Sequence, residues 1–280
     1  MRQQRIRTKI AVRKMLSSAI VFLSLALVLT PIVWIALTSF KTRIEIFTPG
    51  IIFPRTISLD NYVSAFYEFG FGYKLVNSII ICSFTTLFSL ILGIPTAYAL
   101  SRHQFRGRNF LATWILSQRM LPAVATAIPL FIMFSNLRII DTHIGMILAY
   151  MSFSLPLAIW LLRGYFMDIP REIDEAALVD GCNEYQMLFR IFLPMVGPGV
   201  AVTAIFVFLM SWNDFFLALV LTRINAVTVP VGMAAFMQEY KIAWGEAAST
   251  LVVVLIPLLL WIQVVQKHLV RGLTMGAVKG

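Results

Sequence analysis

The chain has 280 residues, of which 59% are hydrophobic and only 13% are charged. An ordinary soluble domain carries about 25% charged residues, and the mean hydropathy of +0.84 is typical of a bilayer protein. The composition therefore excludes a typical soluble enzyme. The formal charge of +10 does not indicate a nucleic-acid partner, because the basic residues flank apolar runs, as they do in loops that hold membrane helices in place.

The chain begins with a basic N-terminus, residues 1–14, followed by an apolar run. That run has no charged residue from Met15 to Phe40, so it is longer than the core of a cleavable signal and long enough to span a bilayer. Lipid admits only helices or closed barrels, and the apolar runs of this chain lack the alternation of a barrel. The predicted fold is an all-α polytopic membrane protein with six transmembrane helices, at 15–39, 75–101, 109–135, 144–162, 196–222 and 247–266.

The distribution of basic residues predicts the orientation of these spans. The two chain ends and the loops after the second and fourth spans hold 15 of the 23 Lys and Arg residues, whereas the opposite side holds seven. Because basic loops stay in the cytoplasm, both termini are predicted to be cytoplasmic. The outer segment 40–74 is rich in aromatic residues and is expected to form short interfacial helices.

Nothing in the sequence indicates an enzyme. Cys82 falls in a span and Cys182 in a loop, so they are not expected to pair, and the three histidines have no metal-type spacing. There is no G-x-x-x-x-G-K-[ST] run of the kind that binds phosphates. We therefore predict no catalytic residues, no metal site and no cofactor bound by this chain.

The connection between the fourth and fifth spans is unusual, because six of the 13 acidic residues lie between Asp168 and Glu184. Its local signals predict two short helices. Asp168 is expected to cap the first, with Pro170 in its first turn, and Gly181 is expected to end it in a left-handed conformation.

The second helix of this connection is expected to begin at Asn183, in a capping box with Gln186, and to end at Pro194. Two interpretations of the helix pair remain open. An amphipathic pair resting on the membrane surface is the simpler one, but an acidic first helix suits an anionic leaflet poorly. The small residues Ala176 and Ala177, above an apolar second helix, favour docking into the cleft of a partner.

The sequence Glu175-Ala176-Ala177, followed by Gly181 and by Ile191-x-Leu193-Pro194, resembles the EAA loop of permease subunits of ATP-binding-cassette importers. Asp180 and Phe189 fit the sugar-importer form of this loop, whereas Cys182 stands where alanine is more usual. The C-terminal run VRGLTMGAVKG, from Val270, is similar to the end of carbohydrate permeases related to the smaller membrane subunit of the maltose transporter. Further agreements are Ser211-Trp212-Asn213-Asp214 and the turn Asp141-Thr142-x-x-Gly145.

The resemblance implies a type I importer architecture in a bacterial inner membrane. The chain would form half of the pathway for a sugar or sugar derivative. Its partners would be a second, non-identical permease, two copies of a cytoplasmic ATPase that holds ATP and Mg, and an extracytoplasmic sugar-binding protein. The permease domain would cover 15–268, with a cytoplasmic coupling loop at 164–195 and a cytoplasmic tail at 269–280.

The resemblance also implies two contacts with the ATPase. The coupling residues would be Glu175, Ala176, Ala177, Asp180 and Gly181, with Glu175 the first choice for an ion pair. The tail residues Gly276, Ala277, Val278 and Lys279 would reach the same partner, although their glycine content also fits a solvated chain end.

Polar residues inside the spans are candidates for the translocation path. Arg119 is costly at depth in a bilayer and lies before two prolines that permit a broken helix. It would either satisfy freed carbonyls or pair with Asp214, or it would line the pore. Trp212, Asn213 and Asp214 would meet sugar or pack against the partner permease, and adjacent helix residues do not share one face.

Two other functions remain open. A stand-alone secondary transporter or channel driven by an ion gradient would need paired intramembrane charges, and only Arg119 and Asp214 are candidates. A non-transporting membrane scaffold would leave the acidic loop unexplained unless another partner docks there.

Overall fold

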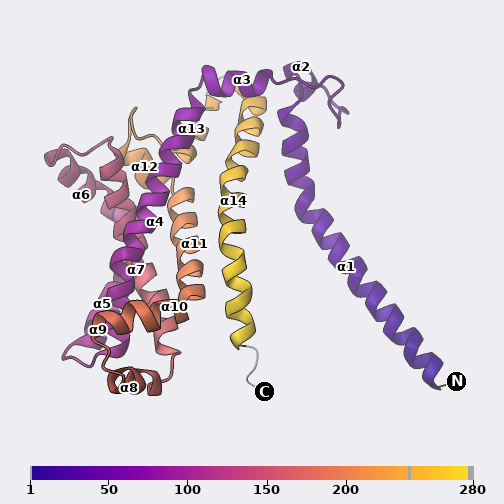
Figure 1. The fold of residues 1–280 in the computed structure, drawn as a ribbon. Helices are drawn as coiled ribbons and strands as arrows, with labels where there is room; N and C mark the ends of the chain where they lie inside the picture. Colours follow the sequence, from indigo (N-terminus) through magenta and orange to yellow (C-terminus); the bar gives the residue numbers. More distant parts are fainter. Residues whose placement is uncertain (1, 239–240, 277–280) are drawn as a thin grey trace. The chain divides into compact units, whose positions relative to one another are not determined.

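The computed structural model describes the backbone of residues 2–238 and 241–276, and the side chains of residues 14–237 and 243–263. The chain is divided into two compact units, whose helices and strands are labelled in chain order in Figure 1. Unit one comprises residues up to Phe69 together with Phe236–Val253, and unit two comprises Gly70–Ala235 with the chain from Val254 onward.

Unit one contains the long helix α1, two short helices and a small hairpin. Its elements are α1 (Arg2–Ser39), α2 (Arg43–Phe47), α3 (Asp60–Tyr67), β1 (Met237–Gln238), β2 (Lys241–Ile242) and the start of α14 (Trp244–Gly276). The strands pair antiparallel, Met237 with Ile242. The two short helices in segment 40–74 agree with the helical pieces expected there.

The side chain of Asn61 holds the end of α1 in unit one. Its amide Nδ2 donates to the carbonyl oxygens of Ser39 and Lys41, at 3.0 and 2.8 Å. The hydroxyl of Ser249 donates in turn to the Asn61 carbonyl at 3.1 Å. Because a carbonyl at a helix end lacks an intrahelical partner, these bonds fix the chain where it leaves α1.

Unit two is a bundle in which α4 packs along α7 and α11 packs against both. Its elements before α14 are α4 (Phe71–Arg102), α5 (Arg108–Ser117), the 3₁₀ turn Gln118–Met120, α6 (Ala123–Asn136), α7 (His143–Met167), α8 (Glu172–Val179), α9 (Glu184–Gln186), the π-helical turn Met187–Phe192, α10 (Leu193–Met195), α11 (Gly197–Asn213), α12 (Phe216–Leu221) and α13 (Val229–Ala234). One apolar core lies around Tyr98, Phe166 and Phe192, and another around Phe134, Met146 and Leu221.

Apart from the two-residue strands, the regular elements of the described residues are all helices. Four described helices are long and apolar enough to cross a membrane, and the number rises to six if each of two bent pairs is one span. The first pair, Arg108–Met120 and Ala123–Asn136, bends by 95°, and the second, Glu184–Met195 and Gly197–Asn213, bends by 77°. The first bend lies at Pro122, which holds Leu121 in an extended conformation, as the prolines predicted.

The structure corrects three details of the predicted spans. Helix α14 continues to Gly276, ten residues beyond the predicted end of the sixth span at residue 266. The run 196–222 is not one helix, because α11 ends at Asn213 and α12 begins at Phe216. Asp214, in extended conformation, accepts a hydrogen bond from the Leu217 N–H at 3.1 Å, and so stabilises a new helix start. Helix α7 extends from His143 to Met167, five residues beyond the predicted end of its span at residue 162.

Candidate functional site

Helix α8 lies at the same end of unit two as α5 and α9 (Figure 1). Its first turn carries Glu172, Asp174 and Glu175, whose charges complement the positive end of the helix dipole. At its other end, Gly181 has φ of 74°, and the N–H groups of Gly181 and Cys182 donate to the carbonyls of Leu178 and Ala177. These bonds form a Schellman motif, which confirms the predicted role of Gly181.

The start of α8 differs from the prediction. Asp168 does not cap α8, because its backbone N–H donates to the Gly164 and Phe166 carbonyls and it forms the C-terminal end of α7. Pro170 precedes the first turn, and α8 begins after Arg171 without a side-chain cap.

The predicted second helix of the loop begins at its predicted cap, Asn183, and ends within one residue of its predicted end, Pro194. The Asn183 side chain accepts from the Gln186 N–H, and the Gln186 side chain accepts from the Asn183 N–H, so the capping box is present. The helical stretch ends at Met195, one residue after Pro194. Its middle is a π-helical turn that the sequence did not predict.

The two alanines of α8 lie on different faces. Ala177 is only 3% exposed and belongs to the apolar core, whereas Ala176 is exposed beside Glu175. The expectation that both alanines face the cleft of a partner is therefore wrong for Ala177, since successive helix residues point about 100° apart. The outer surface also includes Leu178 and Val179, of which Val179 is 88% exposed.

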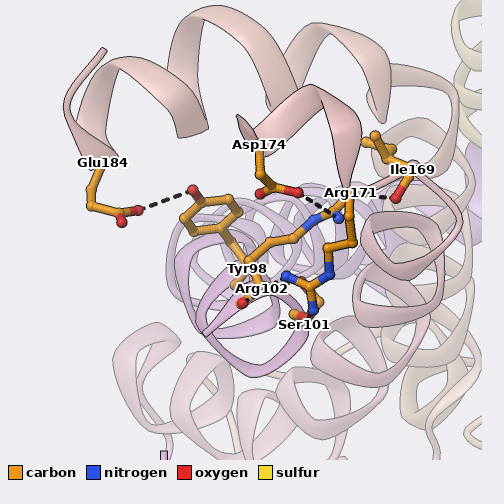
Figure 2. A network of polar contacts seen from close by, with 7 residues as sticks. All are labelled: Tyr98, Ser101, Arg102, Ile169, Arg171, Asp174 and Glu184. Atoms are coloured by element: carbon orange, nitrogen blue, oxygen red, sulfur yellow. Dashed lines mark hydrogen bonds and ion pairs between the residues drawn. The ribbon is translucent and has the colours of Figure 1, made fainter. Parts of the chain in front are cut away.

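A buried guanidinium anchors α8 to the end of α4 (Figure 2). Arg102, the last residue of α4, donates to an Asp174 carboxylate oxygen and to the Ile169 carbonyl, each at 2.9 Å. It also lies over the Phe192 ring, 4.8 Å from its centroid. Arg102 thus joins α4, α8 and the helix that follows α8.

Further polar contacts reinforce this junction. Arg171 donates to the carbonyls of Arg102 and Ser101, at 2.9 and 3.2 Å, and so caps the C-terminal end of α4 (Figure 2). The Tyr98 hydroxyl donates to Glu184 at 3.1 Å, and the same carboxylate lies 3.4 Å from His103. The acidic loop is therefore fixed to the bundle through two of its six carboxylates.

The other exposed carboxylates of α8 and its C-terminal cap are unengaged. Within the part of the chain that the structure describes, Glu172, Glu175 and Asp180 form no side-chain hydrogen bond or ion pair, and all three are exposed. A rigid helix thus presents free negative charges and exposed apolar side chains side by side. This combination suits contact with a basic and partly apolar protein surface.

A pocket of about 590 Å³ lies elsewhere in unit two, between the bent α5–α6 pair, α7, α11 and α12. Arg119, Asn213 and Asp214 line it together with Tyr150 and Ser154. The volume is within the range of about 300–1,000 Å³ that is usual for small-molecule sites. Three of the four residues proposed from sequence for a translocation path therefore meet in one pocket.

The fourth residue, Trp212, does not line that pocket. It is 3% exposed and stacks on Phe208, which stacks in turn on Trp261. Arg119 does not pair with Asp214, and the contact that its guanidinium makes is with the Met210 sulfur at 3.3 Å. Both alternatives that the sequence offered for a structural Arg119, a pair with Asp214 and bonds to freed carbonyls, are absent among the described residues.

Asp141 forms a second polar centre at the other end of α7. Its carboxylate accepts hydrogen bonds from the backbone N–H groups of Arg223, Ile224, Asn225 and Ala226. Its own N–H donates to the Leu221 carbonyl at 2.9 Å. Partial burial alone would raise the pKa of this carboxyl, but the four backbone donors outweigh burial and lower the pKa below its ordinary value.

Residues 89–275 match the family described as binding-protein-dependent transport system inner membrane component. The chain belongs to this family. The trehalose transport system permease protein SugB of Mycobacterium tuberculosis is 36% identical to this inner membrane component over 255 residues, which cover 90% of the chain and 93% of SugB. The trehalose/maltose transport system permease protein MalG of Thermococcus litoralis is 35% identical over 256 residues, covering 90% of the chain and 92% of MalG.

A solved structure shows the same fold. One chain of a bacterial ABC transporter involved in the import of the acidic polysaccharide alginate superposes with a TM-score of 0.75 at 24% identity. The match covers 92% of this inner membrane component and 96% of that chain. At this level of identity the likeness concerns the fold alone.

The sequence did not reveal which residues of this inner membrane component fix the acidic loop to the bundle. Arg102, Arg163 and Arg171 counted only as cytoplasmic basic residues, yet in the structure all three donate to backbone carbonyls. The pairing of Arg102 with Asp174 joins positions 72 residues apart, and no local pattern signals it.

The tail residues fall at the limit of the described chain. Helix α14 continues to Gly276, and Ala277, Val278 and Lys279 lie outside the described residues. Among the described residues, no group of three or more His, Cys, Asp or Glu is placed to hold a metal ion.

Proposed function

We propose that this chain is the permease subunit of an ATP-binding-cassette importer and forms half of the membrane pathway for a sugar or sugar derivative. Its membership of the inner-membrane-component family supports this assignment, as do relatives that transport trehalose and maltose. The alternative, a stand-alone transporter driven by an ion gradient, is disfavoured by the same relationship.

The proposed topology has six spans, with both termini and the coupling loop 164–195 in the cytoplasm of a bacterial inner membrane. The basic N-terminus 1–14 and the tail 269–280 flank the permease domain 15–268. The count of six rests on treating each bent helix pair as one span, and the orientation rests on the excess of basic residues on one side.

The partners follow from this function. A second, non-identical permease completes the pathway, two copies of a cytoplasmic ATPase supply the energy, and an extracytoplasmic sugar-binding protein delivers the substrate. ATP and Mg are held by the ATPase, because this chain has no phosphate-binding loop. The tail residues Gly276, Ala277, Val278 and Lys279 are proposed to contact the same ATPase.

The exposed acidic face of α8 is the proposed contact with the ATPase. Glu175 and Asp180 are exposed and unpaired within the described chain, so they are available to basic groups of an ATPase. Arg102 holds the opposite face of α8 to α4 through Asp174. A force on α8 is therefore transmitted to α4, and α4 packs along α7 and α11.

A charge reversal at Glu175 tests this coupling. Glu175→Lys is expected to abolish sugar uptake and sugar-stimulated ATP hydrolysis, while membrane insertion and the amount of protein stay normal. Asp60→Lys, at an exposed carboxylate in unit one, is the control and is expected to transport normally. Normal uptake by the Glu175 variant would rule out this residue as the coupling contact.

The pocket lined by Arg119, Asn213 and Asp214 is proposed as part of the sugar pathway. Its donors and acceptors suit hydroxyl groups, and the neighbouring, partly exposed ring of Phe153 suits the face of a sugar. Asn213→Leu is expected to lower uptake at least ten-fold but to leave stimulation of the ATPase by the loaded binding protein intact. Unchanged uptake would exclude the pocket from the pathway.

A further inference from the structure

A second pocket lies within unit one, where α1 ends. It has a volume of about 460 Å³ and is lined by the rings of Trp34 and Trp244, the side chains of Lys41 and Thr48, and the segment around Gly50. These two tryptophan residues are each about half exposed, at 51% and 48%. This pocket shares no lining residue with the one in unit two and has no role in the proposed coupling.

Lys41 gives the pocket its charge. The residue is only 3% exposed, and its ammonium donates to the Ile51 carbonyl at 2.8 Å and lies 4.8 Å from the centroid of the Trp34 ring. Among the described side chains no carboxylate lies within ion-pairing distance of it. The nearby Glu45 carboxylate is instead engaged by the backbone N–H groups of Thr42 and Arg55.

The bonds within the chain do not neutralise this ammonium. A lysine ammonium has three N–H donors, and a carbonyl and an indole face supply only partial charges. Buried charges are ordinarily paired with an opposite charge, because an unpaired one is costly. An anion bound in the Lys41 pocket would neutralise this charge, whereas a neutral sugar would not.

The position of the pocket indicates which anion is available. Lys41 comes two residues after Ser39, the last residue of the apolar helix Lys14–Ser39, so it lies where a membrane helix leaves the hydrocarbon. Phosphate groups of lipids are concentrated at that depth, and Trp side chains are enriched there. A Lys near a helix end reaches this layer.

We propose that the Lys41 pocket binds the phosphodiester of a membrane phospholipid, with the ammonium facing the phosphate and the Trp34 and Trp244 rings against the glycerol and the first acyl carbons. Sugar uptake is not needed for this binding. The inference requires only that the helix Lys14–Ser39 spans the membrane, so it is independent of the proposed coupling and of the transported sugar.

Native mass spectrometry of the assembled importer in mild detergent tests the proposal, with phosphatidylglycerol added in a titration. Wild-type protein is expected to retain one phospholipid per copy of this chain at concentrations at which Lys41→Met binds at least ten-fold more weakly. Arg43→Met is the matched control, because Arg43 lies two residues away and is exposed, and it is expected to bind like wild type.

Two further variants keep the test decisive if Lys41→Met does not assemble. Lys41→Arg, which keeps the charge, is expected to retain the lipid, and Trp244→Ala, at a half-exposed ring, is expected to weaken binding. Inorganic phosphate and glycerol phosphate at millimolar concentration should not displace the lipid; displacement would show a site for a free anion instead. Equal lipid retention by wild type, Lys41→Met and Trp244→Ala would overturn the proposal, as would a partner-subunit carboxylate found within 4 Å of Lys41.

Discussion

Arg102 links the end of α4 to α8. Its guanidinium pairs with Asp174, and the exposed fractions of the two side chains are 3% and 16%. The sequence predicted that Arg102 lies in a basic cytoplasmic loop, but charge counting says nothing about which carboxylate, if any, it meets. Only the packing of α4 against α7 brings the two residues together.

Replacement of Arg102 by Met is expected to destabilise the acidic loop by about 3–5 kcal/mol, because it leaves the largely buried Asp174 carboxylate without its partner. Limited proteolysis should then cut between α7 and α9 faster than in wild type. Arg106→Met, which removes an exposed guanidinium from the short loop between α4 and α5, should leave the cleavage rate unchanged. Equal protection of wild type and Arg102→Met would contradict the anchoring role.

Asp141 provides a pH-dependent prediction. Its pKa is lowered in the folded protein, so its stabilising effect is complete above the unfolded pKa of about 3.9 and is lost as pH falls through the lower folded value. Asp141→Asn keeps the shape but removes the charge, and should cost about 1–3 kcal/mol at neutral pH. The thermal midpoints of variant and wild type should converge below about pH 4, and a constant difference down to pH 3 would exclude this mechanism.

At the scale of elements, caps could be predicted where the signal is local. The Schellman motif at Gly181 and the Asn183–Gln186 capping box depend on residues within five positions of each other, and both are present. The start of α8 depends instead on how far α7 continues, and α7 extends through the position expected for a new cap at Asp168. Burial of Ala177 depends on contacts with the core around Phe192, which the sequence of α8 alone does not specify.

The packing of α11 against α7 depends on one glycine. A Cβ atom at Gly199 would lie 2.3 Å from Cγ of the Tyr165 ring, so the two helices approach too closely for any larger residue. Gly199→Ala is expected to destabilise the bundle by about 1–3 kcal/mol through overpacking. The matched change Gly197→Ala meets nothing within 4 Å and should be neutral. Equal thermal midpoints for the two variants would show that α11 shifts without cost.

At the scale of the whole molecule, hydropathy predicted where apolar segments lie better than it predicted their shape. The bend at Pro122 has a sequence signal, since proline removes a backbone donor and constrains its neighbour. The break between α11 and α12 has a weaker local signal, which hydropathy does not register: Asp214 accepts a hydrogen bond from the Leu217 N–H three residues later, as a capping aspartate does. The bend at Pro122 and the break between α11 and α12 both shape the pocket of unit two. Arg119, Asn213 and Asp214 were therefore predictable as candidate residues, but the sequence did not predict that they line one pocket.

The predicted orientation in the membrane has its own test, because the chain has two free cysteines of different exposure. Cys82 is buried, with 1% exposure, whereas Cys182 is partly exposed next to α8. If the loop 164–195 is cytoplasmic, a membrane-impermeant maleimide should label Cys182 in inverted vesicles but not in right-side-out vesicles. Thr56→Cys in a Cys182→Ser background should show the opposite pattern, since Thr56 is exposed in the predicted outer segment.

Labelling of Cys182 in right-side-out vesicles would invert the proposed topology. If an ATPase covers α8, removing peripheral subunits from the inverted vesicles should increase the labelling of Cys182.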